Sequence, residues 1–372
     1  MKKISILFLL LGVLIFSGLR GQETTEKPLN SDSATHNLLL THPTVHNLKV
    51  MVNLLKQELI ELKDYRLVGV YHELERYDYD QSKAFLDTLK YDGPQIFLRE
   101  LRDSISSDLL YGNNPLSDDF RILFRQSQGV IFFGGPDMPP EVYGEKTHLH
   151  TSLWDPYRHY FELSFLYHLL GGSQNEDYQG LIGQDPDYLI YGFCLGMQTM
   201  NVATGGSMVQ DIPSEIYGLN YVEDILKMDR DRLHRNYNNR LSIEEDLLSG
   251  HFHGVHFTCP SLSKRWKIEN FHPLVYSNHH QAVEEVGKGF QIAATSMDGK
   301  IIEGLRHKDY DHVIGVQFHP EALFLYDSTA SYREAPGDRR SFTGPGILKK
   351  ARSMEFHRQF WHDFNRRLEG GK

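Results

Sequence analysis

Short apolar runs and helix-like periods alternate along most of the chain. Four runs are nearly all apolar, which suits strands covered on both faces, and they span residues 66–71, 129–133, 188–191 and 313–318. Stretches with helical periodicity lie between several of them, for example residues 157–170 and 198–204. This alternation predicts an α/β fold with a mainly parallel central sheet and helices on both faces.

Three further segments complete the expected domain. Residues 48–62 and 354–368 show apolar positions at a helical period, and the stripe in the second segment, which includes Phe360 and Trp361, predicts packing against the core. Between residues 291 and 303, two β-type runs flank an Asp-Gly turn, which predicts a hairpin added to the sheet. We therefore expect a single domain that covers residues 48–372.

The N-terminus differs in composition from the rest of the chain. Two lysines precede the apolar run of residues 4–16, a pattern typical of a secretory signal peptide. The run is shorter than the roughly 20 residues that a membrane-spanning helix needs. We therefore expect residues 1–21 to be removed, residues 22–47 to form a flexible leader, and the protein to be periplasmic or secreted with no stable membrane span. Leu19 occupies a position where signal-peptide cleavage sites usually have a small residue, so an uncleaved membrane anchor is the alternative to a removed signal peptide.

Two segments interrupt the α/β pattern as insertions. They cover residues 143–156 and residues 221–250, and the second is rich in charged side chains. The sequence does not decide between a lid over a site and a contact between the two chains of a homodimer.

The charge of the chain limits its partners. The formal net charge is −10 at pH 7, and beyond residue 21 lysines and arginines run no longer than pairs. A nucleic-acid partner needs a basic patch, so none is expected. A membrane-surface patch is not expected for the same reason.

Candidate chemistry begins at Gly192-Phe193-Cys194-Leu195-Gly196, which follows a predicted strand and precedes a predicted helix. Flanking glycines permit the tight turn of a nucleophile elbow, which exposes the central side chain at the carboxyl end of the strand. A helix N-terminus there favours a thiolate, and the next backbone N–H can face an oxyanion. The motif alone is weak, because a buried structural cysteine also suits a glycine-rich turn.

Two other predicted strands end in complementary groups. One is followed by His319-Pro320-Glu321, where the carboxylate can hold the imidazole as a base toward a thiol. The other is followed by Gly134-Gly135-Pro136-Asp137, whose consecutive glycines can turn backbone N–H groups toward a ligand. Open α/β sheets place their sites at the carboxyl ends of strands, so the three motifs are expected at one site.

Together these motifs resemble the class I glutamine amidotransferase superfamily, and more closely its gamma-glutamyl-gamma-aminobutyrate hydrolase branch. The first likeness rests on Gly-x-Cys-x-Gly-x-Gln at 192–198, Gly-Gly-Pro-Asp at 134–137 and Phe-His-Pro-Glu at 318–321. The second rests on segments such as Ser277-Asn278-His279-His280-Gln281. The resemblance runs from about residue 66 to residue 321 and implies the flavodoxin-like glutamine amidotransferase fold.

The resemblance also implies a cysteine hydrolase that cleaves the gamma-glutamyl amide bond of a small compound through a thioester, without a cofactor. In that reaction Cys194 would be the nucleophile, His319 the base and Glu321 the group that orients the histidine. The backbone N–H groups of Gly135 and Leu195 would form the oxyanion hole. The substrate pocket would be lined by Gly134, Gln198, His279 and His280.

Two positions depart from the family pattern, and both lie close to the expected substrate. Leu195 stands where an arginine is usual and Tyr276 where an asparagine is usual, so the resemblance does not fix the leaving group. Hydrolysis of poly-gamma-glutamate tails is the alternative among enzymes. A catalytically retired binding protein of the same fold is the alternative outside them. A true amidotransferase component would need a synthase partner.

The cysteines and the paired histidines each have a competing interpretation. Cys194 and Cys259 are the only two cysteines, and in an exported protein a structural disulfide is the alternative to a free nucleophile. His279 and His280 are metal-ligand types, but adjacent histidines point in different directions and no carboxylate motif with metal-ligand spacing accompanies them. No metal site is therefore expected.

Overall fold

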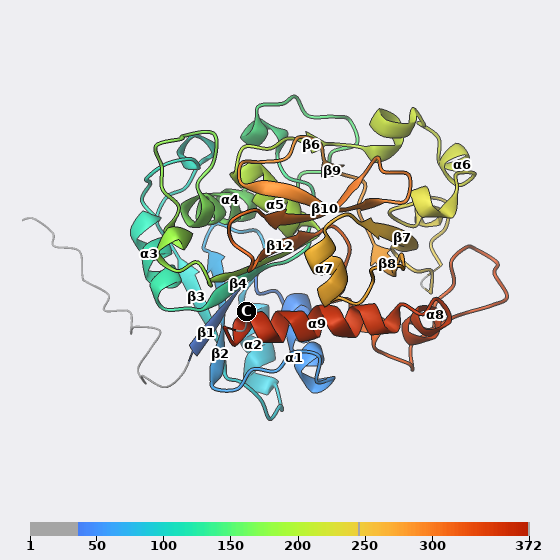
Figure 1. Cartoon of the computed structure of the whole chain (residues 1–372), viewed down its shortest axis with the longest axis horizontal. Helices are drawn as coiled ribbons and strands as arrows, with labels where there is room; N and C mark the ends of the chain where they lie inside the picture. The colour runs from blue at the N-terminus through green and yellow to red at the C-terminus, as the bar shows by residue number, and fades with distance from the viewer. Residues whose placement is uncertain (1–35, 245, 371–372) are drawn as a thin grey trace, which may run out of the picture. The chain divides into compact units, whose positions relative to one another are not determined.

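In the computed structural model, which describes residues 36–244 and 246–370, one large sheet organises the fold (Figure 1). Its parallel part consists of β1 (His36–Thr41), β2 (Tyr65–His72), β3 (Ile96–Leu101), β4 (Gly129–Phe132), β5 (Leu189–Phe193) and β12 (Val313–Val316). Its antiparallel part consists of β7 (His251–Phe257), β8 (Leu274–Ser277), β10 (Phe290–Ser296) and β11 (Ile302–His307).

The strand order brings distant parts of the chain together. The ten strands run in the order β3-β2-β1-β4-β5-β12-β11-β10-β7-β8. The pairs from β3 to β12 are parallel and the pairs from β12 to β8 are antiparallel. β4, β5 and β12 are therefore neighbours with their carboxyl ends at the same edge, although β12 follows β5 by more than a hundred residues.

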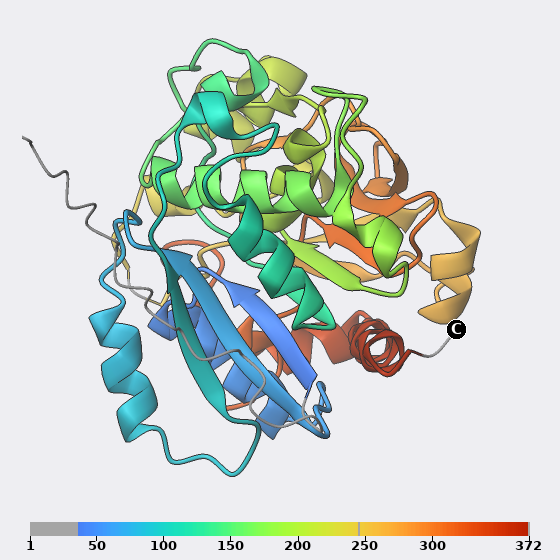
Figure 2. The same cartoon turned by 90° about the vertical axis from the view of Figure 1, so that its left-hand side faces the viewer.

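Helices cover both faces of the sheet (Figure 2). On one face α1 (Val45–Lys56) and α9 (Met354–Leu368) bury their apolar sides in a core shared with β1, β4 and β5. The other face carries α3 (Ser117–Arg125), α4 (Pro156–Leu170) and α5 (Leu195–Ala203). The other α-helices of the described residues are α2 (Asp80–Thr88), α6 (Val222–Ile225), α7 (Pro260–Arg265) and α8 (Gly344–Lys350), and a small second sheet consists of β6 (Met208–Val209) and β9 (Ala282–Val283).

The predicted α/β fold is confirmed, and most expected elements agree with the structure. The four apolar runs correspond to β2, β4, β5 and β12, and the expected hairpin is the antiparallel pair of β10 and β11. The stripe of the C-terminal helix is core, because Phe360 and Trp361 are fully buried. Amphipathic and continuously apolar segments were predicted well because the spacing of their apolar residues indicates which faces are buried.

The expectation of a flexible leader up to residue 47 is wrong for its last part. β1 lies inside the sheet between β2 and β4, and α1 begins at Val45. The apolar run of β1 is only three leucines long, and it is preceded by Asn37, which is fully buried. That burial is tolerated because the Asn37 backbone N–H donates to Gln128 Oε1 over 2.9 Å and its side chain donates to the Gln126 carbonyl.

The predicted signal peptide lies outside the described residues, as do residues 22–35 of the leader. Within the described part of the chain, no helix is both long and apolar enough to cross a membrane.

Candidate active site

Cys194 occupies a sharp turn between β5 and α5. Its backbone has φ 51° and ψ −106°, a conformation that costs a residue with a side chain about 1–3 kcal/mol. Two glycines make the turn possible, since a Cβ on Gly196 would lie 2.2 Å from the Phe132 carbonyl oxygen and one on Gly192 would lie 2.6 Å from the Gly196 carbonyl carbon. The predicted nucleophile elbow is therefore present, with the helix packed tightly against the strands.

His319 and Glu321 follow β12, the strand beside β5. His319 Nδ1 lies 2.7 Å from Glu321 Oε1, and the imidazole and Cys194 both flank Gly134, since a Cβ on that glycine would lie 2.7 Å from His319 Cε1 and 3.5 Å from Cys194 Cβ. The parallel pairing of β5 with β12 brings these groups together, because both strands end at the same edge of the sheet. The three residues predicted as a triad thus form one connected group.

The surroundings of His319 favour its protonated form. Burial alone would lower the pKa of His319, but the Glu321 carboxylate and the Cys194 sulfur raise it well above its usual value. An imidazolium between a carboxylate and a sulfur is the arrangement that activates a cysteine nucleophile. Cys194 and Cys259 are both free, so the structural disulfide is wrong.

A further polar group at the sulfur was not predicted. Gln317 is buried and its Nε2 donates to Cys194 Sγ over 3.6 Å. Its Oε1 accepts a hydrogen bond of 3.2 Å from Gln198, whose Nε2 also donates to the Gln281 carbonyl. Gln198 lines the pocket as expected, but its amide is used to hold Gln317. The sequence feature that could have identified Gln317 is its position, since it is a polar residue directly after the apolar strand that leads to His319.

The expected oxyanion donors are the backbone N–H groups of Leu195, which directly follows the cysteine, and of Gly135. Leu195 starts α5, where the first backbone N–H groups have no partner inside the helix. Among the described residues, neither the Leu195 nor the Gly135 N–H donates to a backbone group. Gly135 lines the pocket together with Cys194. The geometry therefore leaves both amides available for a developing negative charge.

Gly134 has a different place from the one predicted. It is not among the described residues that line the pocket. Instead, a Cβ at this position would lie 2.7 Å from His319 Cε1 and 3.5 Å from Cys194 Cβ. Gly134 therefore gives the imidazole room to reach the sulfur.

We expect Gly134→Ala to lower kcat by about 10²-fold or more, because the added methyl group displaces the His319 ring and small misplacements of catalytic groups are costly. Stability should change much less, since the ring is partly exposed and can move aside. Steady-state kinetics and thermal unfolding measure the two effects. Gly112→Ala is the control, because a Cβ there meets no atom within 4 Å. Wild-type kcat in the Gly134 variant would contradict this packing.

Arg158 of α4 holds the loop that carries Gly134 and Gly135. Its Nη2 donates to the carbonyl oxygens of Phe133 and Gly134 over 2.9 and 3.0 Å, and its Nε donates to Glu162 Oε1 over 3.2 Å. Both charged side chains are fully buried. The sequence offered no signal for this role, because Arg158 lies on a helix more than twenty residues away from the loop.

We expect Arg158→Met to lower the free energy of unfolding by about 3–5 kcal/mol, because it leaves the Glu162 carboxylate buried without its cation. Chemical denaturation measures the change. The double variant Arg158→Met/Glu162→Gln should recover part of the loss, since the unpaired charge is gone. Arg121→Met is the control, because its ion pair with Asp118 is exposed and should contribute less than about 1 kcal/mol. An Arg158 variant as stable as the wild type would show that the buried pair does not hold this loop.

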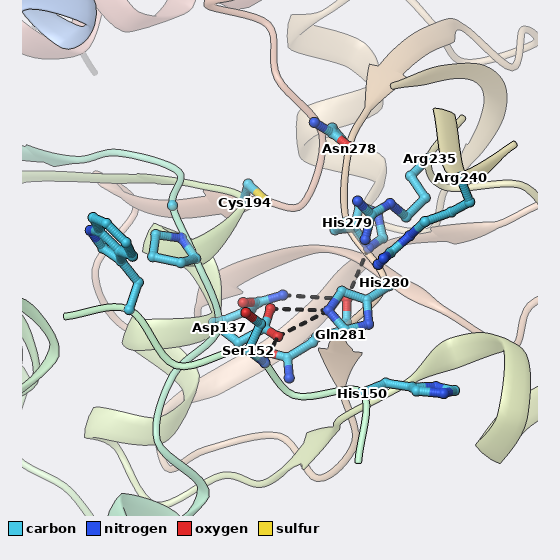
Figure 3. A pocket seen from close by; sticks show the side chains of 14 residues that line it. Asp137, His150, Ser152, Cys194, Arg235, Arg240, Asn278, His279, His280 and Gln281 are labelled. Atoms are coloured by element: carbon cyan, nitrogen blue, oxygen red, sulfur yellow. Dashed lines mark hydrogen bonds and ion pairs between the residues drawn. The ribbon is translucent and has the colours of Figure 1, made fainter. Parts of the chain in front are cut away.

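Cys194 lies in the wall of a pocket of about 440 Å³ (Figure 3). Both predicted insertions contribute to it. His150, Ser152 and Trp154 come from the first, and the second supplies Arg235 and Arg240. The structure thus places the two insertions in the wall of this site.

The paired histidines both line the pocket, as expected, but their rings have different partners. His280 Nδ1 lies 3.0 Å from Asp211 Oδ1 and its Nε2 lies 3.0 Å from Asp137 Oδ2. Burial lowers the pKa of His280, whereas the hydrogen bonds to these carboxylates raise it, and the net change is upward. His279 Nδ1 instead bonds the Gln281 carbonyl at 2.9 Å. Both ring nitrogens of His280 are thus engaged by carboxylates of the protein.

Comparisons with known proteins show which proteins the chain is similar to. Residues 114–321 match the family model described as peptidase C26. Glutamine amidotransferase-like protein YvdE of Lactococcus lactis is 26% identical over 195 residues, which cover 52% of this chain and 66% of that protein. Protein NtpR of Enterococcus hirae is 28% identical over 208 residues, or 55% and 71% of the two chains. A GMP synthase protein of Thermoplasma acidophilum aligns over 90% of this chain and 95% of its own, at 12% identity and a TM-score of 0.35.

Proposed function

The chain belongs to the peptidase C26 family, and from this membership and the site we propose that it hydrolyses the gamma-glutamyl amide bond of a small compound. The family and the relatives support the broader statement that it is a cysteine-dependent enzyme of the amide hydrolase or amidotransferase type. The matched region contains Cys194, His319 and Glu321. To this statement we add the roles of the three triad residues, gamma-glutamyl compounds as the substrate class, and hydrolysis as the reaction.

In the proposed reaction, the Cys194 sulfur attacks the gamma-carbonyl carbon and its proton resides on His319. His319 protonates the leaving nitrogen as the C–N bond breaks, which leaves a gamma-glutamyl thioester on Cys194. Water then gives a proton to His319 and attacks the thioester, the S–C bond breaks, and glutamate leaves. Glu321 orients the imidazole and stabilises its charge, while the Gly135 and Leu195 N–H groups bind the oxyanion in both steps.

The pair of guanidinium groups in the pocket is the observation that best supports the proposed substrate class. Arg235 and Arg240 lie beside the paired histidines, across the pocket from Cys194 (Figure 3). Among the described residues, neither forms an ion pair, and Arg235 lies over the Tyr237 ring at 5.8 Å. Guanidinium groups bind carboxylates well. A gamma-glutamyl group offers an α-carboxylate to these arginines and an α-ammonium group to Asp137.

We expect Arg235→Gln and Arg240→Gln to lower kcat/KM for gamma-glutamyl amides by about 10–100-fold each, because a carboxylate loses its partner. The assay measures glutamate release by the purified chain from gamma-glutamyl amides, from α-glutamyl amides and from simple amides without the α-groups. Arg125→Gln, an exposed change on α3, is the control. Equal hydrolysis of the simple amides would overturn the proposed substrate class.

The same panel separates the alternatives. A preference for oligo-gamma-glutamyl chains over a single gamma-glutamyl unit would indicate a tail hydrolase. Hydrolysis by the chain alone argues against the need for a synthase partner. No hydrolysis of any substrate would favour the retired binding protein. Export of the protein is also part of the proposal and rests on the composition of residues 1–21, so cell fractionation tests it.

A further inference from the structure

Behind the pocket wall, three histidines and one carboxylate meet in the interior. His234 comes from the second insertion, His253 from β7, His279 from the segment after β8, and Glu303 from β11. One ligand atom of each lies within 4.8 Å of the others. From Glu303 Oε1 the distances are 3.0 Å to His234 Nδ1, 4.0 Å to His253 Nε2 and 3.9 Å to His279 Nε2.

Much of the hydrogen-bonding capacity of this cluster is unused. Within the described part of the chain, both nitrogens of His234, both carboxylate oxygens of Glu303 and His279 Nε2 are buried without a hydrogen-bond partner. The 3.0 Å contact between His234 and Glu303 is short enough for a hydrogen bond but is not aligned as one. Buried polar groups are nearly always partnered. So many exceptions in one place indicate a ligand shared by all four side chains.

The neighbouring groups orient the imidazoles toward a common point. His279 Nδ1 donates to the Gln281 carbonyl and His253 Nδ1 to the Gly254 carbonyl, at 2.9 and 3.1 Å. These bonds leave the Nε2 lone pair of each ring directed into the cluster, as the outer hydrogen bonds of metal-binding histidines do. His253 Nε2 also lies 2.8 Å from the Ser277 hydroxyl, which can rotate.

We propose that His234, His253, His279 and Glu303 bind one divalent transition-metal ion, with Zn²⁺ the best match. Three imidazole nitrogens and one carboxylate oxygen suit Zn²⁺, whereas Mg²⁺ and Ca²⁺ prefer oxygen ligands. Tetrahedral bonds of about 2.1 Å place ligand atoms about 3.4 Å apart. The three distances from Glu303, 3.0 to 4.0 Å, bracket that value.

The site is structural and goes beyond the proposed hydrolysis. All four side chains are buried, none more than 4% exposed, so the ion would have four protein ligands and no open position for a substrate. It would tie the second insertion to β7 and β11. Because His234 precedes Arg235 and His279 precedes His280, the ion would fix the wall that carries the cationic side of the pocket.

The test is the metal content of the full-length chain, measured after purification and after chelation followed by titration with Zn²⁺ or Co²⁺. We expect about one ion per chain, a rise in the unfolding temperature on binding, and the visible absorption of tetrahedral Co²⁺. His234→Asn and Glu303→Gln should each reduce the bound metal to less than about a tenth of an ion per chain. His256→Asn should retain it, because His256 is exposed on the same strand as His253.

Cys194→Ala should also retain the ion, which separates this site from zinc bound by the catalytic thiol. A chelated wild-type chain that binds neither Zn²⁺ nor Co²⁺ at a defined stoichiometry would overturn the proposal. So would metal that is kept by folded His234→Asn or lost in Cys194→Ala. If the ligand variants do not fold, the wild-type Co²⁺ spectrum decides, since octahedral or thiolate coordination contradicts the three-histidine site. None of these readouts depends on hydrolysis, so failure of the metal site and failure of the proposed function are distinguishable.

Discussion

Cys194→Ala should abolish hydrolysis, with kcat/KM for gamma-glutamyl amides reduced at least about 10⁴-fold. The variant removes the sulfur that forms the thioester in the proposed reaction, while His319, Glu321 and the proposed oxyanion donors stay in place. Stability should change little, because the substitution keeps the Cβ of the residue and leaves the backbone strain at this position the same as in the wild type. Glutamate release and thermal unfolding measure the two effects.

The matched control is Cys259→Ala. Cys259 is also buried, but its sulfur contacts Ser261 and Arg306 and it does not line the pocket. Activity should therefore be close to that of the wild type. A Cys194 variant that keeps more than a few per cent of the activity, with Cys259→Ala inactive, would reverse the assignment of the nucleophile.

Glu321→Gln should lower kcat by about 10²–10⁴-fold, because the amide replaces the charge that orients and stabilises the imidazolium. The sign of the pH effect follows from the same contact. Burial lowers the pKa of His319 while the Glu321 carboxylate contributes to raising it, so loss of that charge lowers the pKa. The imidazolium is then lost at lower pH, and the alkaline decline in kcat should begin earlier in the variant than in the wild type.

A double-variant cycle tests whether Glu321 acts through His319. In an His319→Asn background, adding Glu321→Gln should have almost no further effect, because groups that act as one unit are not additive. Glu355→Gln, an exposed change on α9, is the control for loss of a carboxylate. Independent, additive losses from the two substitutions would show that Glu321 does not orient this histidine.

Much of the fold was predictable because burial and periodicity coincide. β4, β5 and β12 are largely apolar and each is followed by one of the three motifs, so the proximity of Cys194, His319 and Glu321 could be predicted once the strands were taken as parallel neighbours. β1 was missed because its apolar run is short and its buried Asn37 is compensated by Gln126 and Gln128, residues distant in the sequence. A compensation of this kind leaves no local pattern.

The supporting groups of the site were missed for a similar reason. Arg158 and Gln317 act through buried hydrogen bonds whose partners lie on other elements. The four side chains of the inferred metal site come from four separate segments, with no ligand spacing that a sequence motif would show. The adjacent histidines do diverge as predicted, but His279 meets partners that only the sheet brings together.

Trapping of the acyl-enzyme tests directly whether Cys194 is the nucleophile. The purified chain is mixed with a gamma-glutamyl amide, or with an electrophilic glutamine analogue that alkylates thiols, then quenched in acid and mapped by mass spectrometry. We expect about one gamma-glutamyl group or label per chain, on the peptide that contains Cys194, and none in Cys194→Ala. A label on Cys259, or substrate turnover without any adduct at Cys194, would contradict it.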